Sequence, residues 1–162
     1  SWARIALATA GRVVDMGVSD ANNMGAAMAP AAADTLIAHF RDTGRTPSDY
    51  DQIITGDLGL VGSRILQELL QKNDYPLDEG RYMDCGLKIF DPEDRVHAGG
   101  SGCGCSATTL SAYILPKLRK GEWKRVLFMA TGALLSPTTN QQGETIPGVA
   151  HAVVLEGGTD KC

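Results

Sequence analysis

Short apolar runs alternate with helical patterns along this chain, and this alternation restricts the fold more than any other feature. Strand-like runs are found at 2–8, 52–55, 125–130 and 151–156. Helical spacing of apolar residues predicts helices from Pro30 to the residue before Gly44, at 63–72 and at 106–119. A weaker strand or irregular segment is predicted at 82–87. This order predicts an α/β layered domain with a mostly parallel mixed sheet and helices packed on it.

Several residues give these helices their expected ends and faces. Pro30 suits a first turn, where its missing N–H costs little. One buried face is predicted for Ala33, Leu36, Ile37 and Phe40. His39, next to Phe40, is expected to be half-exposed. Ser106 is the expected N-cap of the third helix, and Pro116 should bend that helix or open its last turn.

Composition places the chain among ordinary globular domains. It has 162 residues, of which 43% are hydrophobic and 21% charged, with a net charge of −4. Acidic and basic residues are mixed along the sequence. The sequence therefore shows neither the basic patch typical of nucleic-acid binding nor a polybasic segment that would bind an anionic membrane. No apolar run approaches the ~20 residues of a membrane helix, so action at a membrane would need a partner. The chain opens inside a strand pattern without methionine, so residues 1–162 are expected to be one domain of a longer protein.

A glycine-rich turn, GGSGCGCSA at 99–107, opens onto the third helix. Glycines let backbone N–H groups approach a ligand, and a helix N-terminus adds partial positive charge. The turn is therefore either a tight structural corner or the wall of a pocket for an anionic or carbonyl ligand. Cys103 and Cys105 are either small fillers or, with a lowered pKa, nucleophiles. Cysteine spacing matches no zinc pattern, and no cofactor or metal is expected.

Other polar residues follow the predicted strands. Thr55 and Asp57 end one strand and Thr131 follows another, at the edge where open α/β sheets bind ligands. Asp57 either binds a ligand or caps the next segment. His97 is a weak candidate for the same pocket, and His151 is expected to be structural or exposed. No phosphate-loop, dinucleotide or zincin motif occurs.

Five segments together resemble one known family. They are GRVVDMGVSDANNMGAAMAPAAADT, YDQIITGDLGLVGS, DCGLKIF, AGGSGCGCSA and ATGALLSPT. They are very similar to the second half of the stage V sporulation protein AD family, whose members have a thiolase-like fold made of two related halves. The resemblance implies the C-terminal half of that fold. It also implies binding of dipicolinic acid, alone or with calcium, within the complex that moves this acid into the developing spore.

The same resemblance implies the setting of the protein. The expected partners are dipicolinic acid and membrane-embedded proteins of the sporulation complex, and nucleic acid is not expected. The expected location is peripheral to the inner spore membrane, and a homodimer is possible for the full-length protein.

Two departures from working thiolases and ketoacyl synthases indicate a binding protein rather than an enzyme. In those enzymes, a catalytic histidine or asparagine follows the strand that corresponds to 52–55. In this sequence, the residues at that place are Gly56 and Asp57. The later turn, 101–105, also lacks the histidine or asparagine of the enzymes. A positioned base contributes roughly 10²–10⁴-fold to such reactions. The alternative is a degenerate acyltransferase that uses Cys103 or Cys105.

The resemblance also suggests how a dianionic pyridine ligand would be held. One carboxylate would contact the N–H groups of Gly102, Cys103, Gly104 and Cys105 and the hydroxyls of Ser101 and Ser106. Ser19, Asp20 and Thr55 would contribute from the strand ends, with Thr131 nearby. Asp57 fits beside a dianion only if calcium accompanies the ligand or if its carboxylate points elsewhere.

Overall fold

A five-stranded mixed sheet forms the centre of the computed structural model, which describes residues 3–91, 93–94 and 96–158. Its strands, in spatial order, are β1 (Ala3–Thr9), β5 (Gly148–Gly157), β4 (Arg125–Ala133), β2 (Gln52–Thr55) and β3 (Tyr82–Asp84). β2 pairs in parallel with β3 and β4, whereas β5 pairs antiparallel with β4 and β1. The mostly parallel mixed sheet is confirmed: β1, β4, β2 and β3 run in one direction, and β5 runs antiparallel to them because it returns directly alongside β4 without a crossover helix.

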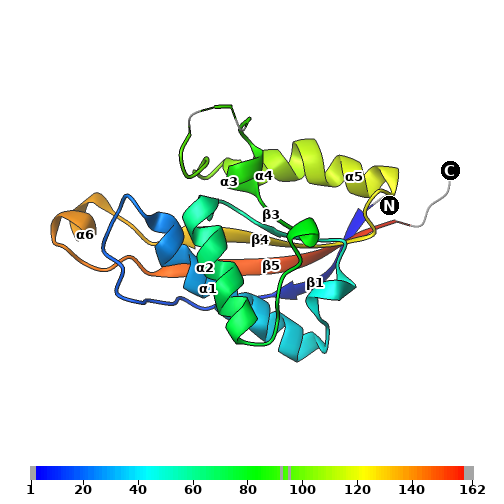
Figure 1. Cartoon of the computed structure of the whole chain (residues 1–162), viewed down its shortest axis with the longest axis horizontal. Helices are drawn as coiled ribbons and strands as arrows, with labels where there is room; N and C mark the ends of the chain where they lie inside the picture. Colours follow the sequence, from blue (N-terminus) through cyan, green and yellow to red (C-terminus); the bar gives the residue numbers. More distant parts are fainter. Residues whose placement is uncertain (1–2, 92, 95, 159–162) are drawn as a thin grey trace.

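Helices cover both faces of this sheet (Figure 1). α1 (Met24–Thr43) and α2 (Gly59–Lys72) lie on one face. On the other face lie α4 (Cys105–Thr109), the π-helical segment η3 (Leu110–Ile114) and α5 (Leu115–Lys120). Each face has its own apolar core, the first built around Leu36, Phe40 and Leu66 and the second around Ile114, Leu118 and Val126. Shorter elements are η1 (Pro47–Asp49), η2 (Glu79–Arg81), α3 (Cys85–Lys88) and α6 (Pro137–Gln141).

α1 begins six residues before Pro30, which corrects the predicted start. The side chain of Asn23 caps the helix by accepting a hydrogen bond from the Ala26 N–H. Pro30 therefore lies inside the helix. The predicted end is confirmed, since Gly44 adopts the left-handed conformation with φ of 67°.

The other helices also differ from their sequence-based bounds. α2 begins at Gly59 rather than Ser63, and Cys85 begins a short helix instead of lying in a strand. The third helix starts at Cys105 with Gly104 as its N-cap, so Ser106 is not the cap. Pro116 does disturb this helix: η3 precedes it, and α5 then restarts with the proline in its first turn. A proline has no N–H to donate, and a first turn does not require one.

β4 runs to Ala133, so Thr131 lies within the strand, opposite Ala150 of β5, rather than in a loop after it. The following loop contains α6. Within the described residues, no helix combines the length and apolar character needed to span a bilayer.

His39 is fully buried, which corrects the expected half-exposure. Its Nδ1 is hydrogen-bonded to the Thr9 hydroxyl at 2.7 Å and its Nε2 to the Tyr50 hydroxyl at 2.6 Å. The side chain thus joins β1, α1 and the segment before β2. Burial lowers the pKa of His39, because the imidazolium form loses its hydration.

This buried histidine predicts an acid-sensitive fold. Below about pH 6.5, His39 binds a proton in the unfolded chain but stays neutral in the folded protein. Protonation therefore favours the unfolded state, and the free energy of unfolding decreases as pH falls. The free energy of unfolding should fall by up to about 1.4 kcal/mol per pH unit from pH 6.5 toward the lowered folded pKa of His39. Urea titrations at pH 7.5, 6.5 and 5.5 measure this slope. His39→Gln should flatten the slope, whereas His97→Gln, at an exposed loop position, should keep it. Equal slopes for wild type and His39→Gln would contradict the assignment.

Candidate functional site

Asp57 fastens the glycine-rich loop to the ends of β2 and β4. Its Oδ2 accepts hydrogen bonds from the Ser101 hydroxyl at 2.8 Å and from the Gly102 N–H at 3.1 Å. Its Oδ1 accepts from the Thr131 hydroxyl at 2.8 Å, and its own N–H donates to Thr131 Oγ1 at 3.1 Å. One carboxylate therefore holds three segments that are far apart in the sequence. Asp57 does not cap the segment that follows it, because the Leu58 and Gly59 N–H groups are bonded to Asp84. The ligand-binding alternative for Asp57 stays a prediction.

Gly56 brings two further hydroxyls to this edge. A Cβ at Gly56 would lie 2.6 Å from Ser106 Oγ and 2.8 Å from Thr131 Oγ1, so only glycine allows this approach. The Cys105 thiol donates to the Gly56 carbonyl at 3.7 Å. We call Asp57, Ser101, Gly102, Ser106 and Thr131 the rim cluster. The sequence proposed all five for one site, and the fold brings them together.

The remaining proposed residues are not among the described hydrogen-bond partners of the Asp57 carboxylate. Ser19 and Asp20 are in the exposed loop before α1, where Asp20 Oδ1 accepts hydrogen bonds from the backbone and side chain of Asn22. Thr55 is buried and donates to Asp84 Oδ2 at 2.6 Å. Cys103 and Gly104 are exposed in the loop. As ligand contacts, all of the proposed residues remain predictions.

A cavity of about 390 Å³, which we call the rim pocket, opens beside Asp57. It is lined by residues 22–25 and 28 at the start of α1, by 57–59 and 61 at the start of α2, and by 98–101 of the glycine-rich loop. The two helix N-termini meet closely, because a Cβ at Gly62 would lie 2.8 Å from the Gly25 carbonyl oxygen. The partial positive ends of both helix dipoles therefore face this pocket. Asn22 and Asn23, rather than Ser19 and Asp20, supply side chains from the first loop.

Asp84 holds the start of α2, whose residues Leu58 and Gly59 line the rim pocket. The sequence analysis did not propose Asp84 as a site residue. Its side chain is only 2% exposed. Its Oδ2 accepts from Thr55 Oγ1 and from the Leu58 N–H, and its Oδ1 accepts from the Gly59 N–H at 3.0 Å. Burial raises the pKa of Asp84, while these hydrogen bonds act against the increase. Asp84 thus caps α2 from a neighbouring strand. A single aspartate after a short apolar run gives no signal in the sequence that separates it from a surface residue.

The histidines and cysteines do not form a catalytic pair at the rim pocket. His97 is exposed, with a φ of 49°, and is not among the residues that line the pocket. His151 is exposed in β5, as expected, and its Nδ1 accepts a hydrogen bond from the Gly11 N–H. Cys105 is buried, and the loss of hydration raises the pKa of its thiol. Among the described residues, no group of three or more histidine, cysteine and acidic side chains could hold a metal.

The sequence pattern that describes stage V sporulation protein AD matches residues 1–156. The chain belongs to the stage V sporulation protein AD family. Stage V sporulation protein AD of Bacillus subtilis (strain 168) is 53% identical over 153 residues, covering 94% of this chain and 45% of the relative. The chain therefore spans somewhat less than half of the length of this curated relative, and its family is one of sporulation proteins.

Two solved structures show the fold of this sporulation protein AD chain. The acetyl-CoA acetyltransferase of Bacillus anthracis matches with a TM-score of 0.52 and 14% identity, over 97% of this chain and 31% of the enzyme. MvaS in complex with 3-hydroxy-3-methylglutaryl coenzyme A matches with a TM-score of 0.53 and 15% identity, over 96% of this chain and 40% of that chain. The thiolase-like fold that the resemblance implied is confirmed.

Proposed function

We propose that this chain forms one side of a non-catalytic binding site for dipicolinic acid, alone or with calcium, used in sporulation. The observation that carries the proposal is the meeting of two helix N-termini and a glycine-rich loop around the rim pocket. Its volume of about 390 Å³ lies in the range of small-molecule sites.

The pocket suits an anion although no lysine or arginine is among the described residues that line it. Partial positive charge comes mainly from the first turn of α1, because at α2 the Leu58 and Gly59 N–H groups are bonded to the Asp84 carboxylate. The amide groups of Asn22 and Asn23 offer donors to a carboxylate. The Gly102 N–H and the Ser101 hydroxyl are already bonded to Asp57, so in this arrangement they shape the pocket wall.

Asp57 is compatible with an anionic ligand because its carboxylate already accepts hydrogen bonds from the protein. Its two carboxylate oxygens accept three hydrogen bonds from the loop and β4, so both oxygens already have donors although Asp57 lines the pocket. These donors offset part of its negative charge. Calcium that accompanies the ligand would offset the rest.

Binding without catalysis follows from the missing proton-transfer groups. No histidine is found among the lining residues that the structure describes, and the asparagines there are at the start of α1 rather than on the glycine-rich loop. Cys105 is buried with a raised pKa, which opposes thiolate formation. The competing hypothesis, acyl transfer by a loop cysteine, then rests on exposed Cys103.

The proposal includes a setting that follows from family membership. We place the full-length protein peripheral to the inner spore membrane, in contact with membrane-embedded proteins of the dipicolinate transport complex, with a homodimer as its assembly. Co-purification from sporulating cells with crosslinking tests these contacts, and recovery of the protein without any membrane protein would contradict them.

Calorimetric titration of the natural full-length protein with dipicolinate, with and without Ca²⁺, tests the binding itself. Asn22→Asp places a negative charge in the rim pocket and should weaken binding by roughly tenfold or more, since 1.4 kcal/mol corresponds to tenfold. Asn140→Asp, on exposed α6, is the matched control and should bind like wild type. Absence of saturable heat from the wild type at millimolar dipicolinate would overturn the proposal.

Thiol labelling separates the two hypotheses. In a Cys162→Ser background, iodoacetamide at pH 7 should label Cys103 fastest, because its side chain is exposed. Cys105 and Cys85 should react at least about tenfold more slowly, because burial raises the pKa of Cys105, and that of Cys85 to about 12. Mass spectrometry of the labelled peptides measures each rate. Labelling of Cys103 or Cys105 well above the rate of a free thiol would favour the acyltransferase hypothesis.

A further inference from the structure

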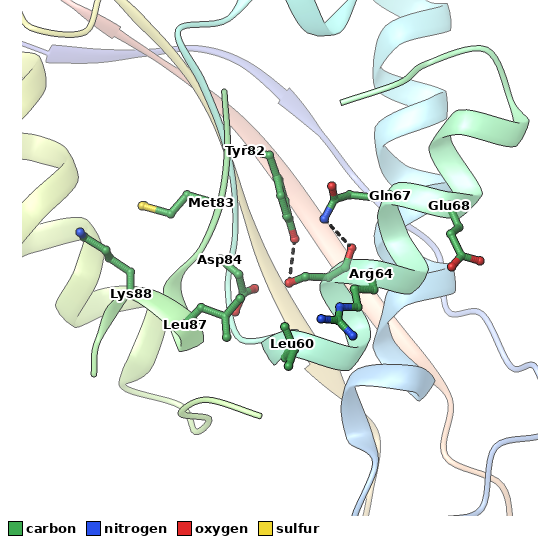
Figure 2. A pocket seen from close by; sticks show the side chains of 10 residues that line it. Leu60, Arg64, Gln67, Glu68, Tyr82, Met83, Asp84, Leu87 and Lys88 are labelled. Carbon is green, nitrogen blue, oxygen red and sulfur yellow. Dashed lines mark hydrogen bonds between the residues drawn. The ribbon is translucent and has the colours of Figure 1, made fainter. Parts of the chain in front are cut away.

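A second cavity of about 560 Å³ lies between α2, β3 and α3, and we call it the β3 cavity. Figure 2 shows its lining side chains, which come from Leu60 to Glu68 of α2 and from Tyr82 to Lys88 of β3 and α3. None of these residues lines the rim pocket. The β3 cavity is therefore a separate site at the edge of the sheet, where β3 is the last strand.

The walls of the β3 cavity are largely apolar. Leu60, Met83 and Leu87 contribute side chains from three different elements. Leu60 is 38% exposed and Leu87 39% exposed, so both keep apolar surface in contact with water. Exposed apolar side chains that line a concave surface are typical of a ligand site, because a ligand with an apolar body would cover them.

One end of the cavity is polar, and its carboxylate is already occupied by donors. The Tyr82 hydroxyl is hydrogen-bonded to Ser63 Oγ at 3.1 Å and to Thr55 Oγ1 at 2.9 Å. Asp84 also lines the cavity, and its two carboxylate oxygens accept hydrogen bonds from Thr55, Leu58 and Gly59. A cation would find no available carboxylate at this end of the cavity.

Positive charge lies at the mouth instead. Arg64 is exposed and makes no ion pair within the described residues. Figure 2 shows its guanidinium directed toward Leu60. Glu68, one turn later on α2, also lines the cavity. Lys88 lies on the opposite side, with its Nζ 4.9 Å from the centre of the Tyr113 ring. An unpaired guanidinium beside an apolar cavity is suited to a carboxylate, which it can bind through two parallel hydrogen bonds.

We propose that the β3 cavity is a second ligand site, which takes a monocarboxylate with an apolar body. The apolar part would lie against Leu60, Met83 and Leu87, and its carboxylate would pair with Arg64 at the mouth. This assignment is independent of dipicolinate binding at the rim pocket.

Calorimetric titration of the natural full-length protein with octanoate tests this site, with octanol as a neutral probe of the same chain length. Octanoate should bind saturably and octanol at least about tenfold more weakly. Arg64→Gln should weaken octanoate binding by roughly tenfold or more, because it removes the charge-assisted bonds while keeping most of the side-chain volume. Lys72→Gln, at the end of the same helix and outside the cavity, is the matched control and should bind like wild type.

Several outcomes would overturn the proposal. They are no saturable heat with millimolar octanoate, equal affinity for octanol, or an Arg64→Gln variant with unchanged affinity. Equal losses in Arg64→Gln and Lys72→Gln would indicate general attraction to surface charge and would also overturn it. Dipicolinate titrations of the same variants keep the two sites distinguishable: Asn22→Asp should lose dipicolinate binding and retain octanoate binding, and Arg64→Gln should show the reverse.

Discussion

Replacing Asp84 with alanine is expected to lower the free energy of unfolding by about 3–5 kcal/mol, the largest effect on stability that we expect from one substitution. Alanine leaves the Thr55 hydroxyl and the N–H groups of Leu58 and Gly59 without their acceptor. Each buried donor that loses its partner costs roughly 1–3 kcal/mol. The measurement is chemical denaturation of the natural full-length protein, followed by far-UV circular dichroism.

Asp51 offers a matched control for Asp84. Its carboxylate also accepts two backbone hydrogen bonds, from the N–H groups of Lys124 and Arg125, but at an exposed site. Water can replace these bonds, so Asp51→Ala should cost only about 1 kcal/mol. Asp84→Asn keeps one acceptor oxygen and should fall between the two. Similar losses for Asp84→Ala and Asp51→Ala would refute the role assigned to burial.

Asp57→Ala is expected to reduce dipicolinate affinity by roughly tenfold or more, with a loss of stability of only about 1 kcal/mol. The substitution frees Ser101, Gly102 and Thr131, so the glycine-rich loop is no longer held in the wall of the rim pocket. A bound ligand would then have to order the loop, and this reduces affinity. Calorimetry gives the affinity, and hydrogen exchange at the Gly102 amide reports whether the loop has been released.

Thr131→Val provides the control for this second prediction. It removes the hydrogen bonds between Thr131 and Asp57 while Ser101 and Gly102 remain bonded to the carboxylate. Its effect on dipicolinate affinity should therefore be clearly smaller than that of Asp57→Ala. If the Gly102 amide exchanges faster in Asp57→Ala while the affinity is unchanged, the loop does not form part of the binding site.

The glycine-rich turn illustrates how far local sequence reasoning reaches. Its composition predicted a tight loop before a helix, and that loop is present. Its N–H groups were proposed as ligand donors, but the Gly102 N–H is bonded to Asp57 and the Cys105 N–H to the Gly102 carbonyl. Which donors remain free depends on where a carboxylate 45 positions earlier in the chain points. No local pattern contains that information.

The predicted starts of two helices were wrong, because they too depend on contacts outside the local sequence. Pro30 and Ser106 were both placed at helix starts from their intrinsic preferences. In α1 the helix begins at Met24 instead, where Asn23 caps it and Gly25 in its first turn packs closely against Gly62 of α2. His39 was expected at a half-exposed position, and the partners that allow its burial, Thr9 and Tyr50, come from other elements.

The sequence by itself determined the α/β class, the order of the main strands and helices, and, through whole segments, the stage V sporulation protein AD family. These properties depend on periodicity and on residue identity, which can be read along the chain. The tertiary structure alone decided that β5 runs antiparallel to β4, that Asp57 holds the loop, that Asp84 caps α2, and that two separate cavities flank α2. Each of these depends on contacts between residues far apart in the sequence, which form only when the sheet brings its strand ends together.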